Sequence, residues 1–268
     1  MFKLITPEII ETTTKFVRVK LADGTICKVS TLLGSGDKNT KLAKNETETY
    51  GLSMAPHTLA AVGNVCPHAS PGCAAACLNG AGNGGIFPKI ANARKAKTVA
   101  FMLAREWFLE KLHKELASKL ARATGELAVR PNVFSDIAWE RYGIIQAFPQ
   151  IQFYDYTKSP GRLELPANYD LTYSRSELAK SETRAIELLA SGARRVAVVF
   201  ACKAWRTEAH KPILPRTWRG YPVFDGDQTD LRYLDPPNIV VGLRAKAIRN
   251  DTRDGMADDG FAVPCVDS

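Results

Sequence analysis

The second half of the chain alternates short apolar segments, which favour β-strands, with helical segments or long connections. The predicted strands are 127–129, 151–156, 169–173, 195–201, 222–224 and 239–243, and the predicted helices between them are 142–147 and 181–190. Strands joined by helices or long crossovers pair in parallel. Because no glycine-rich nucleotide-binding turn accompanies them, these units favour a partial or closed (β/α) barrel of the TIM type over a doubly wound sheet. The sequence therefore predicts an α/β fold.

The N-terminal region has a different pattern. Residues 16–21 and 26–30 alternate apolar and charged or polar side chains, and the Asp-Gly pair between them is typical of a turn, so we predict an antiparallel β-hairpin extension. Residues 33–49 are polar and contain glycine, which predicts an exposed loop.

A long helical pattern covers residues 89–122, with leucines at spacings of three and four, and it allows one break. We expect two regions: an N-terminal β extension with a basic loop at residues 1–48, and a barrel-like domain at residues 49–268 that carries the cysteine cluster.

Composition excludes several classes of protein. With 45% hydrophobic and 24% charged residues, the chain is close to the globular average and far from disordered sequences. The longest uncharged apolar run, Val196–Cys202, is far shorter than the about 20 residues that a membrane helix needs. Met1–Pro7 lacks the apolar core of a signal peptide. We expect a soluble cytoplasmic protein with no membrane partner.

The chain is basic, with 36 Lys and Arg against 28 Asp and Glu, a net charge of +8. Basic side chains gather between Lys15 and Lys44 and again in the helical segment 89–122. They form either an ordinary solvated face or a surface that binds nucleic acid or another anionic ligand through its phosphates.

Three of the six cysteines, Cys66, Cys73 and Cys77, lie within twelve residues in the pattern C-x6-C-x3-C. Disulfide frameworks are typical of short secreted chains, whereas clustered cysteines in a reducing compartment indicate a metal site. Pro and Gly residues interrupt the segment, so we expect a loop that turns back on itself. If a helix begins after Gly72, Cys73 and Cys77 share one of its faces.

The number of cysteine thiolates helps to decide which metal the segment would bind. A structural zinc site takes four ligands, usually in pairs such as C-x2-C, and no second pair is present. Three thiolates from one loop instead suit a [4Fe–4S] cluster with one iron left open or held by a remote ligand. His68, Cys202 and Cys265 are the candidates for that ligand. Zinc, and ordinary buried thiols without a metal, stay as alternatives.

Polar side chains follow several of the predicted strands, where the active sites of (β/α) barrels lie. Strand ends also meet water, which explains part of this polarity. Where the charges sit beside aromatic residues, we expect partial burial and therefore a site. We predict Asp136, Lys158, Arg175 and Glu177 as catalytic groups and Asn132, Ser135, Tyr156 and Ser176 as cofactor-binding groups.

Several segments together resemble the phage family called gene product 88. They are Gly51–His57, Gly63–Leu78, Arg130–Glu140, Asp155–Lys158 and Tyr173–Glu177, and the resemblance covers roughly residues 48–265. It implies a phage origin, and hence the cytoplasm of the host cell, but no particular activity.

A more distant resemblance is to radical SAM enzymes, which place three cysteines on a loop after the first strand of a partial barrel. It implies a [4Fe–4S] cluster on Cys66, Cys73 and Cys77, and S-adenosylmethionine as a second cofactor. The spacing here departs from the C-x3-C-x2-C of those enzymes, and their Gly-Gly-Glu motif is absent. Three hypotheses follow: an iron–sulfur enzyme, a nucleic-acid-binding or processing phage protein with a structural cluster, and a zinc-stabilised binding protein.

Overall fold

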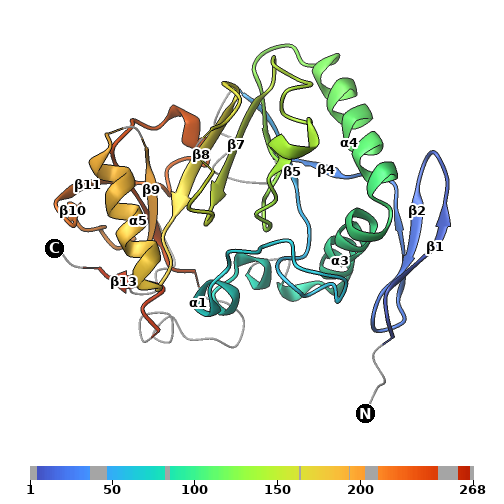
Figure 1. Cartoon of the computed structure of the whole chain (residues 1–268), viewed down its shortest axis with the longest axis horizontal. Helices are drawn as coiled ribbons and strands as arrows, with labels where there is room; N and C mark the ends of the chain where they lie inside the picture. The colour runs from blue at the N-terminus through green and yellow to red at the C-terminus, as the bar shows by residue number, and fades with distance from the viewer. Residues whose placement is uncertain are drawn as a thin grey trace. The chain divides into compact units, whose positions relative to one another are not determined.

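The computed structural model describes residues 5–36, 47–81, 85–162, 164–192, 194–202, 211–246 and 259–265. The described strands form a three-stranded antiparallel sheet and a larger, mostly parallel sheet, accompanied by helices (Figure 1). The predicted α/β class is therefore confirmed, and so is an antiparallel N-terminal element.

The helices and strands have the following bounds. The helical elements are α1 (Pro71–Ala75), η1 (Leu78–Gly80), α3 (Pro88–Leu103), α4 (Arg105–Leu120), η2 (Trp139–Tyr142), α5 (Ala179–Ala190) and η4 (Arg232–Leu234). The strands are β1 (Glu8–Thr12), β2 (Val17–Lys20), β3 (Ile26–Val29), β4 (Leu33–Ser35), β5 (Glu48–Leu52), β6 (Leu127–Arg130), β7 (Gln152–Thr157), β8 (Tyr169–Ser174), β9 (Val196–Ala201), β10 (Thr217–Trp218), β11 (Tyr221–Asp225), β12 (Val240–Arg244) and β13 (Val263–Pro264).

The chain divides into two compact units. Unit 1 consists of Met1–Pro67, Asn83–Asp155 and Glu164–Asp170, and unit 2 consists of His68–Gly82, Tyr156–Leu163 and Leu171–Ser268. The N-terminal sheet thus belongs to one unit with β4 to β6, α3 and α4. The turn that carries Cys73 and Cys77 belongs to the other.

The predicted hairpin is β2 and β3, which pair antiparallel with Val17 opposite Val29. A further strand, β1, pairs with β2 and was not predicted. Its sequence, Glu-Ile-Ile-Glu-Thr, does not alternate apolar and polar residues, so the usual signal of a strand is missing. Its register with β2 shifts between Ile9 and Glu11. The sheet packs against α3 and buries Val17 and Val19 completely (Figure 1).

The predicted helix 89–122 is two helices, α3 and α4, separated at Ala104. The backbone of Ala104 is not helical, with φ −131° and ψ 53°. The break lets Phe101 of α3 and Phe108 of α4 meet with ring centroids 5.3 Å apart, and both rings contact Trp139. An aromatic core of this kind explains why the helix does not run straight through.

In unit 1, β5, β6 and the first part of β7 are parallel neighbours, and β4 is antiparallel to β5 at the edge of the larger sheet. Residues 33–49, predicted as a loop, therefore begin and end in strands, and residues 37–46 lie outside the described residues. The predicted helix 142–147 was wrong: a 3₁₀ turn ends at Tyr142, because Gly143 adopts a left-handed φ of 70°.

In unit 2, β8, β9, β12 and β11 follow one another as parallel neighbours, β10 is antiparallel to β11, and β13 is parallel to β9. Alternate residues of β9 face opposite sides. Val196, Val198 and Phe200 pack in a cluster with residues of α5, which covers this side of the strand (Figure 1). Val199 and Ala201 pack on the other side, in a cluster that contains Cys73.

No strand pairing within the described ranges closes the larger sheet into a ring. A TIM-like barrel, partial or closed, therefore stays a prediction. No helix in the described part of the chain is long and apolar enough to cross a membrane.

Candidate functional site

Asn132, a predicted cofactor-binding residue, lies just after β6 and is buried. Its backbone N–H and side-chain Nδ2 donate to the two carboxylate oxygens of Asp155, at 3.0 and 2.9 Å. Its Oδ1 accepts from the Ser135 hydroxyl (2.8 Å), the Ile137 N–H (2.9 Å) and the Trp139 indole (3.1 Å). One side chain thus fixes the whole loop 131–139.

Asp155 is the fully buried partner of Asn132. The Tyr169 hydroxyl also donates to its carboxylate at 2.9 Å, and the Arg130 guanidinium lies 3.7 Å from it. A buried carboxylate needs such compensation. In this structure Asn132 and Ser135 therefore hold a loop in place, and their predicted contact with a cofactor stays a prediction.

The same loop of unit 1 holds Cys66. The Asp136 N–H donates to the carbonyl of Val65 at 2.9 Å, and the Cys66 thiol donates to the carbonyl of Phe134 at 3.4 Å. The Cys66 sulfur also accepts from the His57 N–H at 3.3 Å. Fixing the loop at Asn132 therefore also places Cys66, next to the predicted catalytic residue Asp136.

In unit 2, Glu177 holds the first turn of α1, which contains Cys73. One Glu177 oxygen accepts from the Ser70 hydroxyl at 2.6 Å, and the other accepts from the Gly72 N–H at 2.8 Å. The Ser70 oxygen in turn accepts from the Cys73 N–H at 3.1 Å as the N-cap of the helix, with Pro71 at its first position. Glu177 therefore acts on Cys73 by positioning its backbone.

The close approach of Glu177 requires glycine at position 72. A Cβ atom on Gly72 would lie 2.9 Å from the Glu177 carboxyl carbon and 2.9 Å from the Cβ of Phe261. Both distances are too short for real atoms. The turn is consequently packed between Glu177, which follows the end of β8, and Phe261, which lies more than eighty residues after Glu177.

Two predicted catalytic cations hold that distant segment. The buried Arg175 donates to the carbonyls of Gly260 (2.6 Å) and Phe261 (3.1 Å) and forms an ion pair with Glu182 at 2.8 Å. The Lys158 ammonium donates to the carbonyl of Arg175 at 3.1 Å and lies 5.2 Å from the centre of the Phe261 ring. Lys158, Arg175 and Glu177 therefore gather around the Cys73 turn, as contacts that support it.

The remaining two predicted residues contribute to packing. Ser176 is buried, and its N–H donates to the Ser181 hydroxyl near the start of α5 at 3.0 Å. Tyr156 packs against a cluster of Ala197, Ile239 and Val241. Their predicted role in cofactor binding is not tested by these contacts.

Two residues of this site were not predicted: Ser70 and Phe261. The Ser-Pro-Gly run before Cys73 is a recognisable helix start, so Ser70 had a local signal. Phe261 had none, because its contact with the turn depends on β13 pairing with β9.

All six cysteines lie in the described ranges, and none forms a disulfide. Cys73 and Cys77 are each partly buried. Within those ranges, no group of three or more His, Cys, Asp or Glu side chains is arranged to hold a metal ion.

Two candidates for the fourth ligand lie elsewhere. Cys202 and Cys265 lie on the α5 side of β9, with their sulfur atoms 2.7 Å apart. Cys73 packs on the opposite side of the same strand. Cys265 therefore does not fold back onto the cysteine turn, and the exposed His68 is the remaining candidate.

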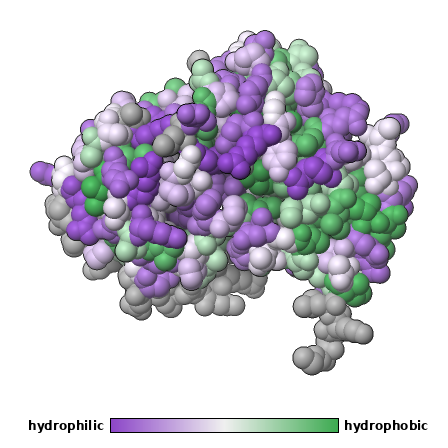
Figure 2. All heavy atoms as spheres, in the orientation of Figure 1, coloured by the Kyte–Doolittle hydropathy of each residue, from purple (hydrophilic) through white to green (hydrophobic). Residues whose placement is uncertain are grey.

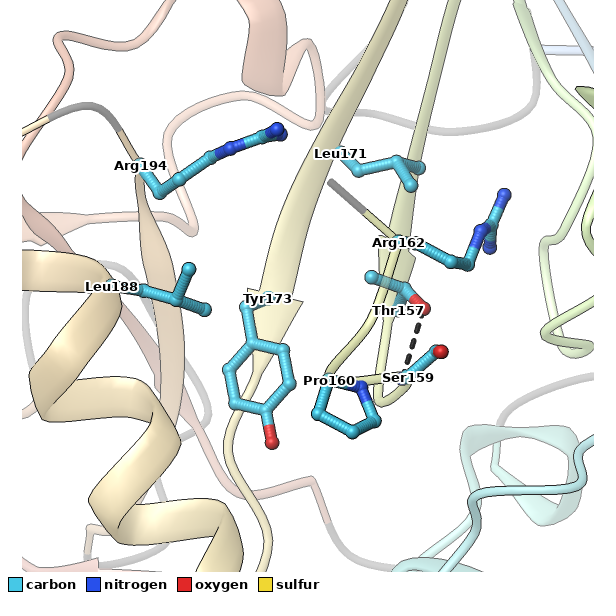
Figure 3. Close-up of a pocket in the computed structure, with 8 residues that line it drawn as sticks. All are labelled: Thr157, Ser159, Pro160, Arg162, Leu171, Tyr173, Leu188 and Arg194. Carbon is cyan, nitrogen blue, oxygen red and sulfur yellow. Dashed lines mark hydrogen bonds between the residues drawn. The ribbon is translucent and has the colours of Figure 1, made fainter. Parts of the chain in front are cut away.

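Unit 2 also contains a small pocket. Figure 3 shows Tyr173 and Leu188 on one wall, Thr157 and Pro160 on the other, and the side chains of Arg162 and Arg194 above them. None of the predicted catalytic residues is among those that line this pocket.

Several residues of the two basic segments have partners within unit 1. Arg18 and Lys20 pair with Glu11 and Glu8 across neighbouring strands, and Lys97 donates to the carbonyl of Leu32 at 2.6 Å. Figure 2 shows apolar side chains gathered over α3 and the N-terminal sheet, so this face is not uniformly basic. Binding of nucleic acid stays a prediction.

Asn132→Ala removes the centre of the unit 1 network and leaves several buried groups without their partner. We expect the free energy of unfolding to fall by about 3 kcal/mol. Denaturant unfolding measures this, with Gln150→Ala, an exposed side chain, as the control that changes it by less than about 0.5 kcal/mol. Equal stability of the two variants would contradict the role given to Asn132.

Gly72→Ala forces a methyl group against Glu177 and Phe261. We expect a loss of about 1–3 kcal/mol in stability and faster hydrogen exchange at Cys73. Gly161→Ala is the matched control in unit 2, since a Cβ there meets nothing within 4 Å. Unchanged exchange at Cys73 in Gly72→Ala would show that the turn is not packed as described.

The Glu177 contacts should depend on pH. Burial by itself raises the pKa of the carboxyl, but the hydrogen bonds from Ser70 and Gly72, with the charge of Lys158, bring the pKa below its ordinary 4.5. A depressed pKa gives stability that is present above the pKa of the unfolded chain and is lost as the pH falls through that of the folded chain.

We therefore expect the stability difference between the wild type and Glu177→Gln to shrink as the pH falls below about 4.3. Ser70→Ala removes one donor and should show a smaller version of the same change. Denaturant unfolding at a series of pH values measures it. A difference that stays constant with pH would refute this electrostatic role.

Comparison with known proteins adds one finding. The sequence profile of the family described as Gene product 88 matches residues 30–260. Comparisons with curated proteins and with solved structures gave no match, so they lend no support to the resemblance to radical SAM enzymes. Because the profile covers most of the chain, the protein belongs to the phage gene product 88 family.

Proposed function

We propose that this protein binds a metal centre through the thiolates of Cys66, Cys73 and Cys77, and that this centre is an iron–sulfur cluster. The observation that carries the proposal is the support of the Cys73 turn. Three hydrogen bonds of Glu177 and Ser70 fix residues 70–73, and glycine at position 72 leaves the room that this contact needs.

Metal ligands in proteins are commonly held in place by hydrogen bonds from the residues around them. Groups that hydrogen-bond around the ligands orient them and contribute substantially to metal affinity. Cys77 follows four residues after Cys73, and its backbone carbonyl accepts from the Gly80 N–H at 3.0 Å at the start of η1. Both thiols are partly buried and neither is in a disulfide, and thiolates are soft ligands that suit iron–sulfur clusters.

The third thiolate is inferred from the sequence. Cys66 lies seven residues before Cys73 in the same segment, and its own backbone N–H is held by Asn64 at 2.7 Å. The described residues contain no preassembled set of three ligands. We therefore expect metal binding to be coupled to a local rearrangement of this segment.

Iron–sulfur is favoured over zinc by the donor set. Three thiolates without a second cysteine pair suit a cluster with one remote or open ligand position, whereas structural zinc takes four protein ligands. A bound cluster would supply electron transfer or a Lewis-acidic iron. The chain's own residues orient the thiolates: Glu177 and Ser70 at α1, and Arg175 and Lys158 through the segment at Phe261.

Catalysis with S-adenosylmethionine is a further step that this proposal does not need. It stays a prediction of the distant resemblance. Cleavage of S-adenosylmethionine by the reduced protein tests it separately, and no cleavage with any reductant would refute it without affecting the metal site.

Cys73→Ala is expected to lose most of the bound iron, because it removes one of the proposed ligands. Cys27→Ala is the matched control: Cys27 is a partly buried thiol of β3, far along the chain from the cluster, and its loss should leave the iron content unchanged. Iron and acid-labile sulfide per chain, counted after anaerobic purification together with visible absorption, measure the effect.

Two results would overturn the assignment. Stoichiometric zinc without iron or sulfide would favour the zinc-stabilised binding protein. Equal iron in Cys73→Ala and Cys27→Ala, or no metal in the wild type, would show that the cysteine segment is not a metal site.

A further inference from the structure

β13 brings the last cysteine of the chain beside β9. The two strands are parallel neighbours, with Val263 opposite Phe200 and Pro264 opposite Ala201. The next residues along are Cys265 and Cys202, and their sulfur atoms lie 2.7 Å apart. This pairing joins positions 63 residues apart and has no part in the proposed metal site.

The two thiols differ in access. Cys202 is 3% exposed and packs in the cluster between β9 and α5. Cys265 is partly exposed, and its thiol also reaches the carbonyl of Ile213 at 3.4 Å. A reagent in solution can therefore reach the Cys265 thiol, while the Cys202 thiol lies buried next to it.

We propose that Cys202 and Cys265 form a thiol–disulfide exchange site, which takes a low-molecular-weight disulfide such as oxidised glutathione and closes to an intrachain disulfide. In reducing compartments, disulfides of this kind are transient and act in catalysis or redox sensing. Exposure of one partner beside a resolving cysteine is the usual arrangement of a redox-sensitive pair.

The reaction balances in two exchange steps. The Cys265 thiolate attacks one sulfur of oxidised glutathione, forms a mixed disulfide and releases the first glutathione as thiolate. Cys202 then gives up its proton to the solvent and attacks the Cys265 sulfur, which forms the Cys202–Cys265 bond and releases the second glutathione. Two protein thiols are oxidised, and one glutathione disulfide is reduced to two thiols.

Backbone geometry favours closure. Neighbouring strands lie about 4.8 Å apart, which falls inside the range of about 4.4–6.8 Å between Cα atoms that a disulfide can span. Cys202 and Cys265 follow directly after the paired residues Ala201 and Pro264, so a disulfide between them needs little backbone movement.

The order of the two steps follows from the surroundings of Cys202. Burial, and then the hydrogen bond with Cys265, raises the pKa of Cys202 to about 12. Cys202 is thus a thiol at neutral pH, and the more accessible Cys265 is the group that begins the exchange.

The disulfide would hold the segment Gly260–Cys265, which contains β13, against β9. Gly260 and Phe261 are held by Arg175, and Phe261 and Ala262 pack in the cluster that contains Cys73. Between Phe261 and Cys265, the strand itself pairs over only two residues. Any effect of oxidation on metal binding rests on the proposed function, whereas formation of the disulfide does not.

The test treats the full-length protein with oxidised glutathione and maps its peptides by mass spectrometry, with and without a reductant. We expect a peptide cross-linked between Cys202 and Cys265 and a loss of two thiols per chain. Amide hydrogen exchange at residues 261–263 should slow at least tenfold on oxidation and recover on reduction. Cys27→Ser should behave as the wild type does.

Single variants separate the two steps. Cys265→Ser should give no cross-link and no slowing of exchange. Cys202→Ser should stop at a stable glutathione adduct on Cys265, because the resolving thiol is missing. Because Cys202 is buried and its replacement lowers stability, Cys265→Ser is the decisive variant.

Three outcomes would overturn the proposal: a wild type that keeps both thiols, one that accumulates the mixed disulfide without closing, and one that cross-links Cys265 to another cysteine. Iron counting on the same samples distinguishes this failure from a failure of the metal site, since each result can occur without the other.

Discussion

Carboxylates withdrawn from water must be compensated by hydrogen bonds, and each unit of this protein meets that demand in a way that fixes a cysteine. In unit 1, Asp155 binds Asn132, and the loop that Asn132 organises holds Cys66 through the carbonyl of Phe134. In unit 2, Glu177 binds the first turn of α1 and so places Cys73. The two carboxylates belong to the region where parallel strands carry their chemistry in α/β folds. Here they position backbone, and the chemistry proposed for the site rests on the thiols.

The cysteines of unit 2 are divided by β9. Alternate side chains of a strand face opposite sides, so Val199 and Ala201 meet the cluster of Cys73, while Cys202 meets α5 and Cys265. This alternation separates a proposed metal segment from a proposed exchange site, although both depend on the chain between Gly260 and Cys265. The chain belongs to the phage gene product 88 family, and the chemistry proposed for it rests on these residues.

Much of the fold was predictable because its signals are local. The apolar runs of β6, β7, β8, β9 and β12, and the hairpin of β2 and β3, follow from alternation and turn residues. β1 escaped prediction because its sequence, Glu-Ile-Ile-Glu-Thr, does not alternate apolar and polar residues. The end of the helical turn at Tyr142 escaped prediction because Gly143 takes a left-handed conformation. Among the predicted site residues, Lys158, Arg175 and Glu177 were chosen by their place after strands, and their catalytic role stays a prediction. Their contacts could not be predicted, since Lys158 and Arg175 act on a segment that only β13 brings near.

By itself, the sequence determined the α/β class, the approximate positions of several strands and the clustering of three cysteines, because each depends on residue types at short spacing. Tertiary structure alone decided which groups meet. It directed both carboxylate oxygens of Glu177 to the Cys73 turn and placed Asn132 in hydrogen-bond contact with Asp155. It also brought Cys265 next to Cys202, from which it is 63 residues away along the chain. The physical reason is that a strand pairing or a buried carboxylate selects its partner by position in space. Sequence separation has no influence on that choice once the sheet has formed.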